Sequence, residues 1–142
     1  MHAYGRIDRI PFSQDLKIVA GLLNPIFTKD ILSSKEKRQQ INQWGRRTLD
    51  RILAKPSLEN FMSECKEFAV KTGFVTKNVL KLINLAEDSG AIGATQNMVG
   101  EAVHALVTID NLESVVKSFT KLLPQENILT ASIDLQGARI LR

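Results

Sequence analysis

The stretch GAIGATQNMVGEAVHALV, residues 90–107, decides how the rest of the sequence is interpreted. Gly90, Gly93 and Gly100 stand among small residues and run into an apolar segment with strand-like alternation. Glycine has no Cβ, so it permits unusual turns and close approach of the backbone to a ligand. The pattern therefore predicts two short strands, AIGATQ and EAVHALVTI, folded back around the turn NMVG.

A helix through residues 95–106 is the competing interpretation of the same stretch. Its apolar stripe would consist of Met98, Val99, Ala102, Val103 and Leu106. Gly100 would then lie inside a helix, at a cost of about 1 kcal/mol relative to alanine. Periodicity alone does not decide between the two.

Length and composition predict one ordinary globular domain. The chain has 142 residues, of which 44% are hydrophobic and 24% charged, enough for a substantial core. No apolar run approaches the roughly 20 residues of a membrane span, and MHAYGRIDR is not a signal peptide. A lone cysteine, Cys65, excludes an internal disulfide and a cysteine-based metal cluster. We expect a cytoplasmic protein without a membrane partner.

A net charge of +4 and a pI near 9.4 suit an anionic partner. Much of the basicity lies in residues 35–55, which we interpret as the solvated face of an amphipathic helix. A basic nucleic-acid binder would use the arginines of this region, but no glycine-aromatic RNA motif is present and Trp44 falls on the apolar stripe. We therefore expect no nucleic-acid partner.

The first half of the chain predicts one strand and three helices. LKIVAGLL, residues 16–23, is apolar and partly β-branched, as in a buried strand. Ser33 with Glu36 forms a capping box, and the helix that follows has the apolar stripe Ile41, Trp44, Thr48, Leu49 and Ile52. Pro56 ends this helix, and Ser57 caps the second helix, which ends at Gly73. Thr76 caps the third helix. Cys65 lies on the apolar face of the second helix and is expected to pack there.

The second half predicts a helix and two closing strands. Asp110 with Glu113 forms another capping box, and the helix carries Leu112, Val115, Val116, Phe119 and Leu122/Leu123 before Pro124. Strands follow at residues 128–133 and 138–141. The predicted order of elements along the chain is thus one strand, three helices, two strands, one helix and two strands. If two of the three helices are extra elements in the first crossover, the remaining order is that of an α+β, ferredoxin-like split βαββαβ fold.

The glycine-rich stretch resembles the third motif of GHMP kinases, a glycine-rich loop that leads into a strand. The matching positions are Gly90, Ala91, Gly93, Asn97, Gly100, Ala105 and Leu106. Within that superfamily the sequence is most similar to archaeal-type pantoate kinases. Four blocks carry this likeness in the same order: NPIFTKDILSSKEKRQQIN, LENFMSECKEFAVKTG, AEDSGAIGATQNMVGEAVHAL and IDLQGARIL. The loop has one glycine where other GHMP kinases have three or more.

The resemblance implies that residues 16–142 are the C-terminal domain of such a kinase and that residues 1–15 are a linker or the remnant of a preceding domain. The superfamily's ATP loop, of the type P-x-x-x-G-L-x-S-S-A, has no counterpart here. Its catalytic and magnesium-binding acids are therefore expected in an N-terminal half, which would be the partner of this chain. The complete enzyme would use ATP and Mg to phosphorylate a hydroxyl of a small-molecule substrate, pantoate, in coenzyme A biosynthesis. The isolated chain is expected to be inactive, and an interdomain face left open would favour a homodimer.

Seven residues are the predicted phosphate or substrate contacts: Gly90, Ala91, Gly93, Asn97, Gly100, Thr28 and Lys29. The glycines let the backbone approach a phosphate, and turn formation is their alternative use. His104 is assigned no catalysis, and no spacing of histidine, cysteine and acids indicates a metal site. The alternative function is a free-standing ferredoxin-like regulatory domain that binds a small anionic effector.

Overall fold

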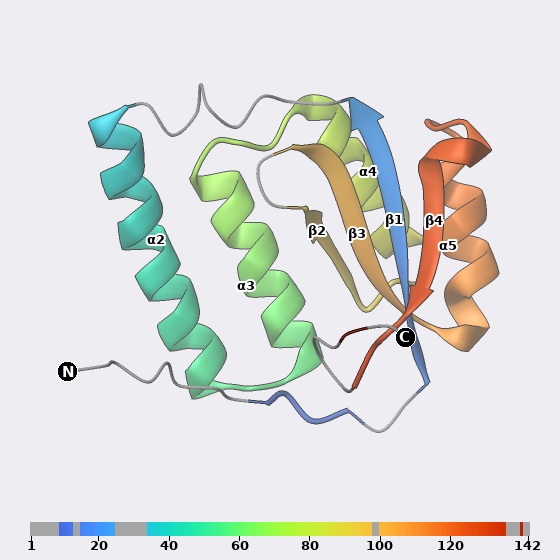
Figure 1. Ribbon diagram of the computed structural model, residues 1–142, viewed down its shortest axis with the longest axis horizontal. Helices are drawn as coiled ribbons and strands as arrows, with labels where there is room; N and C mark the ends of the chain where they lie inside the picture. The colour runs from blue at the N-terminus through green and yellow to red at the C-terminus, as the bar shows by residue number, and fades with distance from the viewer. Residues whose placement is uncertain (1–8, 13–14, 25–33, 98–99, 136–139, 141–142) are drawn as a thin grey trace.

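A four-stranded antiparallel sheet forms the centre of the fold (Figure 1). The computed structural model describes residues 9–12, 15–24, 34–97, 100–135 and 140. The strands are β1 (Leu16–Asn24), β2 (Gly93–Gln96), β3 (Glu101–Thr108) and β4 (Ile128–Ser132), in the order β2-β3-β1-β4. This is the spatial order of a split βαββαβ unit, so the predicted fold is confirmed.

Four helices complete the described chain: α2 (Lys35–Ala54), α3 (Leu58–Lys71), α4 (Lys77–Asp88) and α5 (Leu112–Phe119). Short 3-10 turns, η1 (Ile109–Asn111) and η2 (Gln125–Asn127), flank α5. The extra helices of the first crossover are α2 and α3. Figure 1 shows α2 as the outermost helix, with α3 between it and the sheet.

The two faces of the sheet are covered differently. One face packs against α4 and α5, and its core includes Val19, Leu82, Val103, Val115 and Phe119, all fully buried. The opposite face packs against α3 through a smaller cluster of Leu16, Met62 and Leu106. Burial of apolar surface on both faces makes the sheet a central layer.

Sheet pairing decides the element that periodicity left open. Residues 95–96 and 101–106 belong to two paired strands, with Gly93 opposite Leu106 and Gln96 opposite Val103. Val103, Ala105 and Val107 are completely buried on one face, as alternation requires. The strand expected at residues 138–141 falls almost entirely outside the described residues, and Ile140 is exposed and belongs to no strand.

The helix caps confirm some sequence predictions and correct others. Ser57 and Thr76 each cap a helix, accepting hydrogen bonds from the backbone N–H groups of Asn60 and Val79. The cap of α2 is Ser34, one residue after the predicted Ser33, which lies outside the described residues; its hydroxyl accepts from Lys37 N and donates to Glu36.

The predicted capping box of Asp110 and Glu113 is wrong. Asp110 lies inside the η1 turn, and α5 begins after Asn111 with no side-chain capping bond. The amide of Asn111 is engaged elsewhere, since its Nδ2 donates to the Gly90 carbonyl oxygen at 2.9 Å. At the start of α5, the side chain of the N-cap residue Asn111 therefore makes a tertiary contact with Gly90 and no capping bond.

The apolar stripe of α2 is only partly buried. Ile41, Trp44, Thr48 and Ile52 are half-buried, whereas Leu49 is 55% exposed, and no residue of α2 is fully buried. Leu49 is part of the predicted apolar stripe, but the fold leaves it exposed. The helix rests on α3 rather than on the sheet, so a narrow strip of its surface is covered.

Candidate functional site

The predicted glycine loop lies at one end of the sheet, where β2 turns into β3. Gln96 closes β2 and is 5% exposed. Its Nε2 donates to the carbonyl oxygens of Gly100, at 2.7 Å, and Phe74, at 3.2 Å. The backbone N–H of Asn97 donates to the Ala102 carbonyl at 2.7 Å. The two ends of the loop are therefore held together by a side chain and by the sheet.

An acidic group lies beside this loop, at the first residue of β3. The Glu101 carboxylate accepts a hydrogen bond from Asn24 Nδ2 at 2.9 Å, and the Thr76 hydroxyl also donates to it. These bonds lower the pKa of Glu101, that from Asn24 most. Thr76 is the N-cap of α4, so Glu101 places its negative charge at a helix N-terminus, where the helix dipole favours an anion.

Gly90 and Ala91, two predicted phosphate contacts, form the end of α4. The N–H of Gly90 donates to Glu87 O and the N–H of Ala91 donates to Ala86 O, a Schellman arrangement. Gly90 has φ +97°, which favours glycine. Both amides are thus occupied by carbonyl groups of the helix, and turn formation accounts for these two residues.

Gly93 allows α3 to approach the sheet closely. It is buried within β2, and a Cβ built on it would lie 2.5 Å from Met62 Cβ. Real Cβ atoms do not approach so closely, so a larger residue would force α3 outward. This close packing is the structural reason for a glycine here.

Gly100 and Asn97 are the predicted contacts that the structure leaves accessible at the loop. Among the residues that the structure describes, a Cβ on Gly100 would meet only Asn97 O, at 3.9 Å, so there is room beside it. Asn97 is exposed at the end of β2.

Thr28, Lys29 and also Arg139 lie outside the described residues. β1, the strand that precedes the first two, ends at Asn24, opposite Glu101 across the sheet. The described part of β1 therefore ends at the loop end of the domain. Thr28 and Lys29 stay predictions.

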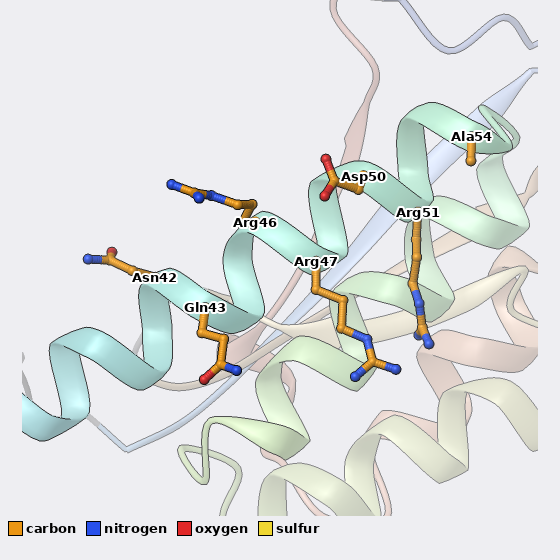
Figure 2. Close-up of a pocket in the computed structure, with 7 residues that line it drawn as sticks. All are labelled: Asn42, Gln43, Arg46, Arg47, Asp50, Arg51 and Ala54. Carbon is orange, nitrogen blue, oxygen red and sulfur yellow. The ribbon is translucent and has the colours of Figure 1, made fainter.

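The basic face of α2 carries an open hollow of about 630 Å³ (Figure 2). Arg47 and Arg51 extend to the same side of the helix, and Asn42 and Arg46 extend to the opposite side. Arg51 forms ion pairs with Glu64 at 3.3 Å and Glu67 at 2.7 Å. The guanidinium of Arg47 lies 5.0 Å from the centre of the Trp44 ring. Two of the arginines on this face are therefore engaged within the fold, as expected for a helix surface.

Cys65 and His104 lie on the α3 side of the sheet and are half-buried. Burial raises the pKa of the Cys65 thiol, with a further contribution from the charge of Glu64. Burial lowers the pKa of the His104 imidazole. Both shifts favour the neutral form of the group, and the half-buried position of Cys65 agrees with the predicted packing.

Across the described ranges, no group of three histidine, cysteine, aspartate or glutamate side chains could hold a metal ion. The helices of these ranges are also too short or too polar to cross a bilayer. The nearest carboxylate to the loop, Glu101, is held by Asn24 and Thr76. The described residues thus offer a loop but no cluster of acids for Mg²⁺.

Sequence reasoning missed Gln96, Asn24 and Thr76 as parts of the loop end. Each makes a hydrogen bond to a residue distant in sequence or across the turn. The one available signal was the polar Gln96 closing an otherwise small and apolar strand, because a buried amide must find partners.

Comparison with known proteins places these features in context, although no family model matches the chain. The chain is 30% identical over 111 residues to a pantoate kinase of Methanocaldococcus jannaschii, covering 78% of this chain and 40% of that protein. It thus spans about two fifths of the length of this curated relative.

Solved structures with the same fold are likewise longer than this chain. One, described as a phosphotransferase related to the CoA biosynthesis pathway, superposes with a TM-score of 0.65 at 23% identity over 85% of this chain and 38% of that chain. Another is L. major mevalonate kinase in complex with R-mevalonate, with a TM-score of 0.61 at 19% identity over 88% and 44% of the two chains. These structural likenesses concern the fold.

Proposed function

The chain belongs to the GHMP kinase superfamily as a domain of the C-terminal type, and from this premise we propose that it is part of an ATP-dependent pantoate kinase. The observation that carries the proposal is the 30% identity to a pantoate kinase over 78% of this chain. In the complete enzyme, the γ-phosphate of ATP is transferred to a hydroxyl of pantoate. An N-terminal domain, on the same or a separate chain, supplies the main ATP loop and the acids that hold Mg²⁺.

Within this enzyme, the loop between β2 and β3 contributes backbone contacts to a phosphate group or the substrate. Support comes from the space beside Gly100 and from Gln96, which holds the loop ends in place. Phosphoryl transfer depends mainly on positioning and charge stabilisation, so a fixed loop is the useful contribution. The N-terminus of α4 is already paired with Glu101, so the loop rather than the helix end receives the anion.

A chimera tests this function. The aligned C-terminal part of the M. jannaschii pantoate kinase is replaced by residues 16–142 of this chain, and ATP-dependent phosphorylation of pantoate is measured. We expect turnover above that of the truncated relative without any C-terminal part. A folded chimera with no turnover on pantoate would refute the substrate assignment.

Two matched variants of the chimera test the loop. Gly100→Ala and Gly45→Ala each add one methyl group at a position with room for it, the first beside the loop and the second on α2. We expect Gly100→Ala to lower turnover by at least about tenfold, because the methyl group blocks close approach of the ligand to the backbone. Gly45→Ala should leave turnover unchanged. Equal turnover in both variants would remove the loop from the site.

A further inference from the structure

The pairing of β1 with β3 is irregular beside the candidate loop. The two strands pair without interruption up to Leu22, which lies opposite Ala102. The next pair is Asn24 with Glu101, so Leu23 is one residue more than β3 matches. Regular pairing would have placed the apolar Leu23 opposite Glu101, and the bulge brings an amide there instead. Bulges that redirect a side chain in this way are common next to active sites.

The carboxylate of Glu101 joins three elements at this end of the sheet. The end of β1, the start of β3 and the start of α4 lie close together there (Figure 1). Glu101 accepts a hydrogen bond from Asn24 Nδ2 at 2.9 Å and another from the Thr76 hydroxyl. Asn24 is 77 residues away in the sequence, so this bond depends on the tertiary fold and not on the local turn.

These bonds restrain the backbone of Gly100, the accessible glycine of the loop. Its carbonyl oxygen accepts from Gln96 Nε2 at 2.7 Å, and the residue that follows it is Glu101. The peptide group between Gly100 and Glu101 is therefore restrained through its carbonyl on one side and through the Glu101 side chain on the other. A backbone that is fixed before a ligand arrives contributes more to binding and positioning, because it need not be ordered on contact.

The charge of Glu101 argues against direct contact with a phosphate. Two negative groups repel each other, and the carboxylate is already paired with two donors at the N-terminus of α4. The lowered pKa of Glu101 agrees with an ionised carboxylate that keeps these donors. The side chain can therefore serve the loop only indirectly, through the backbone that it holds.

We propose, on the basis of the proposed function, that Glu101 is a positioning residue of the candidate loop. Through Asn24 and Thr76, it fixes the backbone of Gly100 in the conformation that receives the phosphate or the substrate. A purely structural role would predict that loss of Glu101 lowers stability and leaves the order of Gly100 and the rate of phosphoryl transfer unchanged.

An exchange of partners tests the pair in the isotope-labelled 142-residue chain. Asn24→Asp sets a second carboxylate against Glu101, and the addition of Glu101→Gln restores one amide and one carboxylate with their roles exchanged. Backbone NMR relaxation should give an order parameter at Gly100 of about 0.85 in wild type and in the double variant. It should fall below about 0.6 in Asn24→Asp and in Glu101→Ala. Glu113→Ala, which removes an exposed glutamate from the first turn of α5, is the control and should behave as wild type.

Three NMR results would overturn the proposal. They are a mobile Gly100 in the wild-type chain, an ordered Gly100 in a folded single variant, and a double variant in which order is not restored. The order parameter of Val103, which is fully buried in β3, shows whether each variant keeps its sheet. Either single variant is sufficient if the other does not fold.

The chimera with the M. jannaschii enzyme adds a catalytic measurement. Glu101→Ala should lower kcat by about tenfold while KM for pantoate stays within about threefold, because the loop positions the transferred group. The double variant should recover kcat to within about threefold of the unsubstituted chimera. An inactive unsubstituted chimera would contradict the proposed function, and the NMR result would then decide the positioning role alone. In an active chimera, equal kcat values for Glu101→Ala and Glu113→Ala would overturn the positioning role and leave the pantoate assignment intact.

Discussion

Gly93→Ala should destabilise the domain through a single steric contact between β2 and α3. The new Cβ would lie 2.5 Å from Met62 Cβ and 3.3 Å from Met62 Cγ. Carbon atoms in contact are ordinarily about 3.5–4.0 Å apart, so the helix must retreat by about 1 Å. The nearer contact involves a Cβ fixed to the helix backbone, so rotation of the Met62 side chain does not relieve it.

The size of the effect follows from this geometry. Overpacking of a core costs about 1–3 kcal/mol, and we expect the upper half of that range because α3 must move as a unit. The free energy of unfolding, measured by urea denaturation with circular dichroism, should therefore fall by about 2–3 kcal/mol. Gly100→Ala is the control, because a Cβ there would make an ordinary contact of 3.9 Å with Asn97 O, and its effect should stay within about 0.5 kcal/mol. Equal urea midpoints for Gly93→Ala and wild type would refute the inferred close packing.

Three further outcomes can be measured on the same chain. Gly90→Ala should lower the free energy of unfolding by about 1–2 kcal/mol in urea denaturation, because φ is +97° and the new Cβ would lie 2.8 Å from the Asn111 amide. Adding Asn111→Ala should restore only the stability lost through the steric contact, and full restoration would contradict the role of φ. The pKa of His104 is lowered in the folded state, so its stabilising contribution is present above the unfolded-state pKa near 6.5 and is lost as pH falls through the folded-state pKa. The free energy of unfolding of wild type should therefore fall more between about pH 7.5 and 5.5 than that of His104→Gln. Parallel pH profiles of the two proteins would exclude this contribution. Calorimetric titration of the isolated chain with Mg-ATP should give a dissociation constant weaker than about 1 mM, and micromolar binding would contradict the need for a separate ATP-binding domain.

Local signals in the sequence were sufficient for most element boundaries. Ser57, Gly73 and Thr76 bound the helices α3 and α4 as predicted, because capping depends on the backbone conformation and hydrogen bonds of a few adjacent residues. The strand β1 was also predicted from its apolar, β-branched composition. The order of elements along the chain then led to the split βαββαβ fold, since only a few topologies are compatible with it.

The tertiary structure decided the choices in which a residue's partner is distant in sequence. The period of residues 95–106 fits a helix as well as a hairpin, and only pairing of β3 with β1 and β2 makes residues 95–96 and 101–106 strands. Asp110 has the sequence pattern of a cap, but the amide of Asn111 bonds to Gly90 and the local box does not form. The same holds at position 93 of β2, where glycine is required because Met62 of α3 lies so close. It also holds for Gln96, whose side-chain oxygen is unpaired because two carbonyl oxygens fix the orientation of its amide. Sequence patterns record what a residue prefers locally, whereas these contacts exist only once distant segments have packed together.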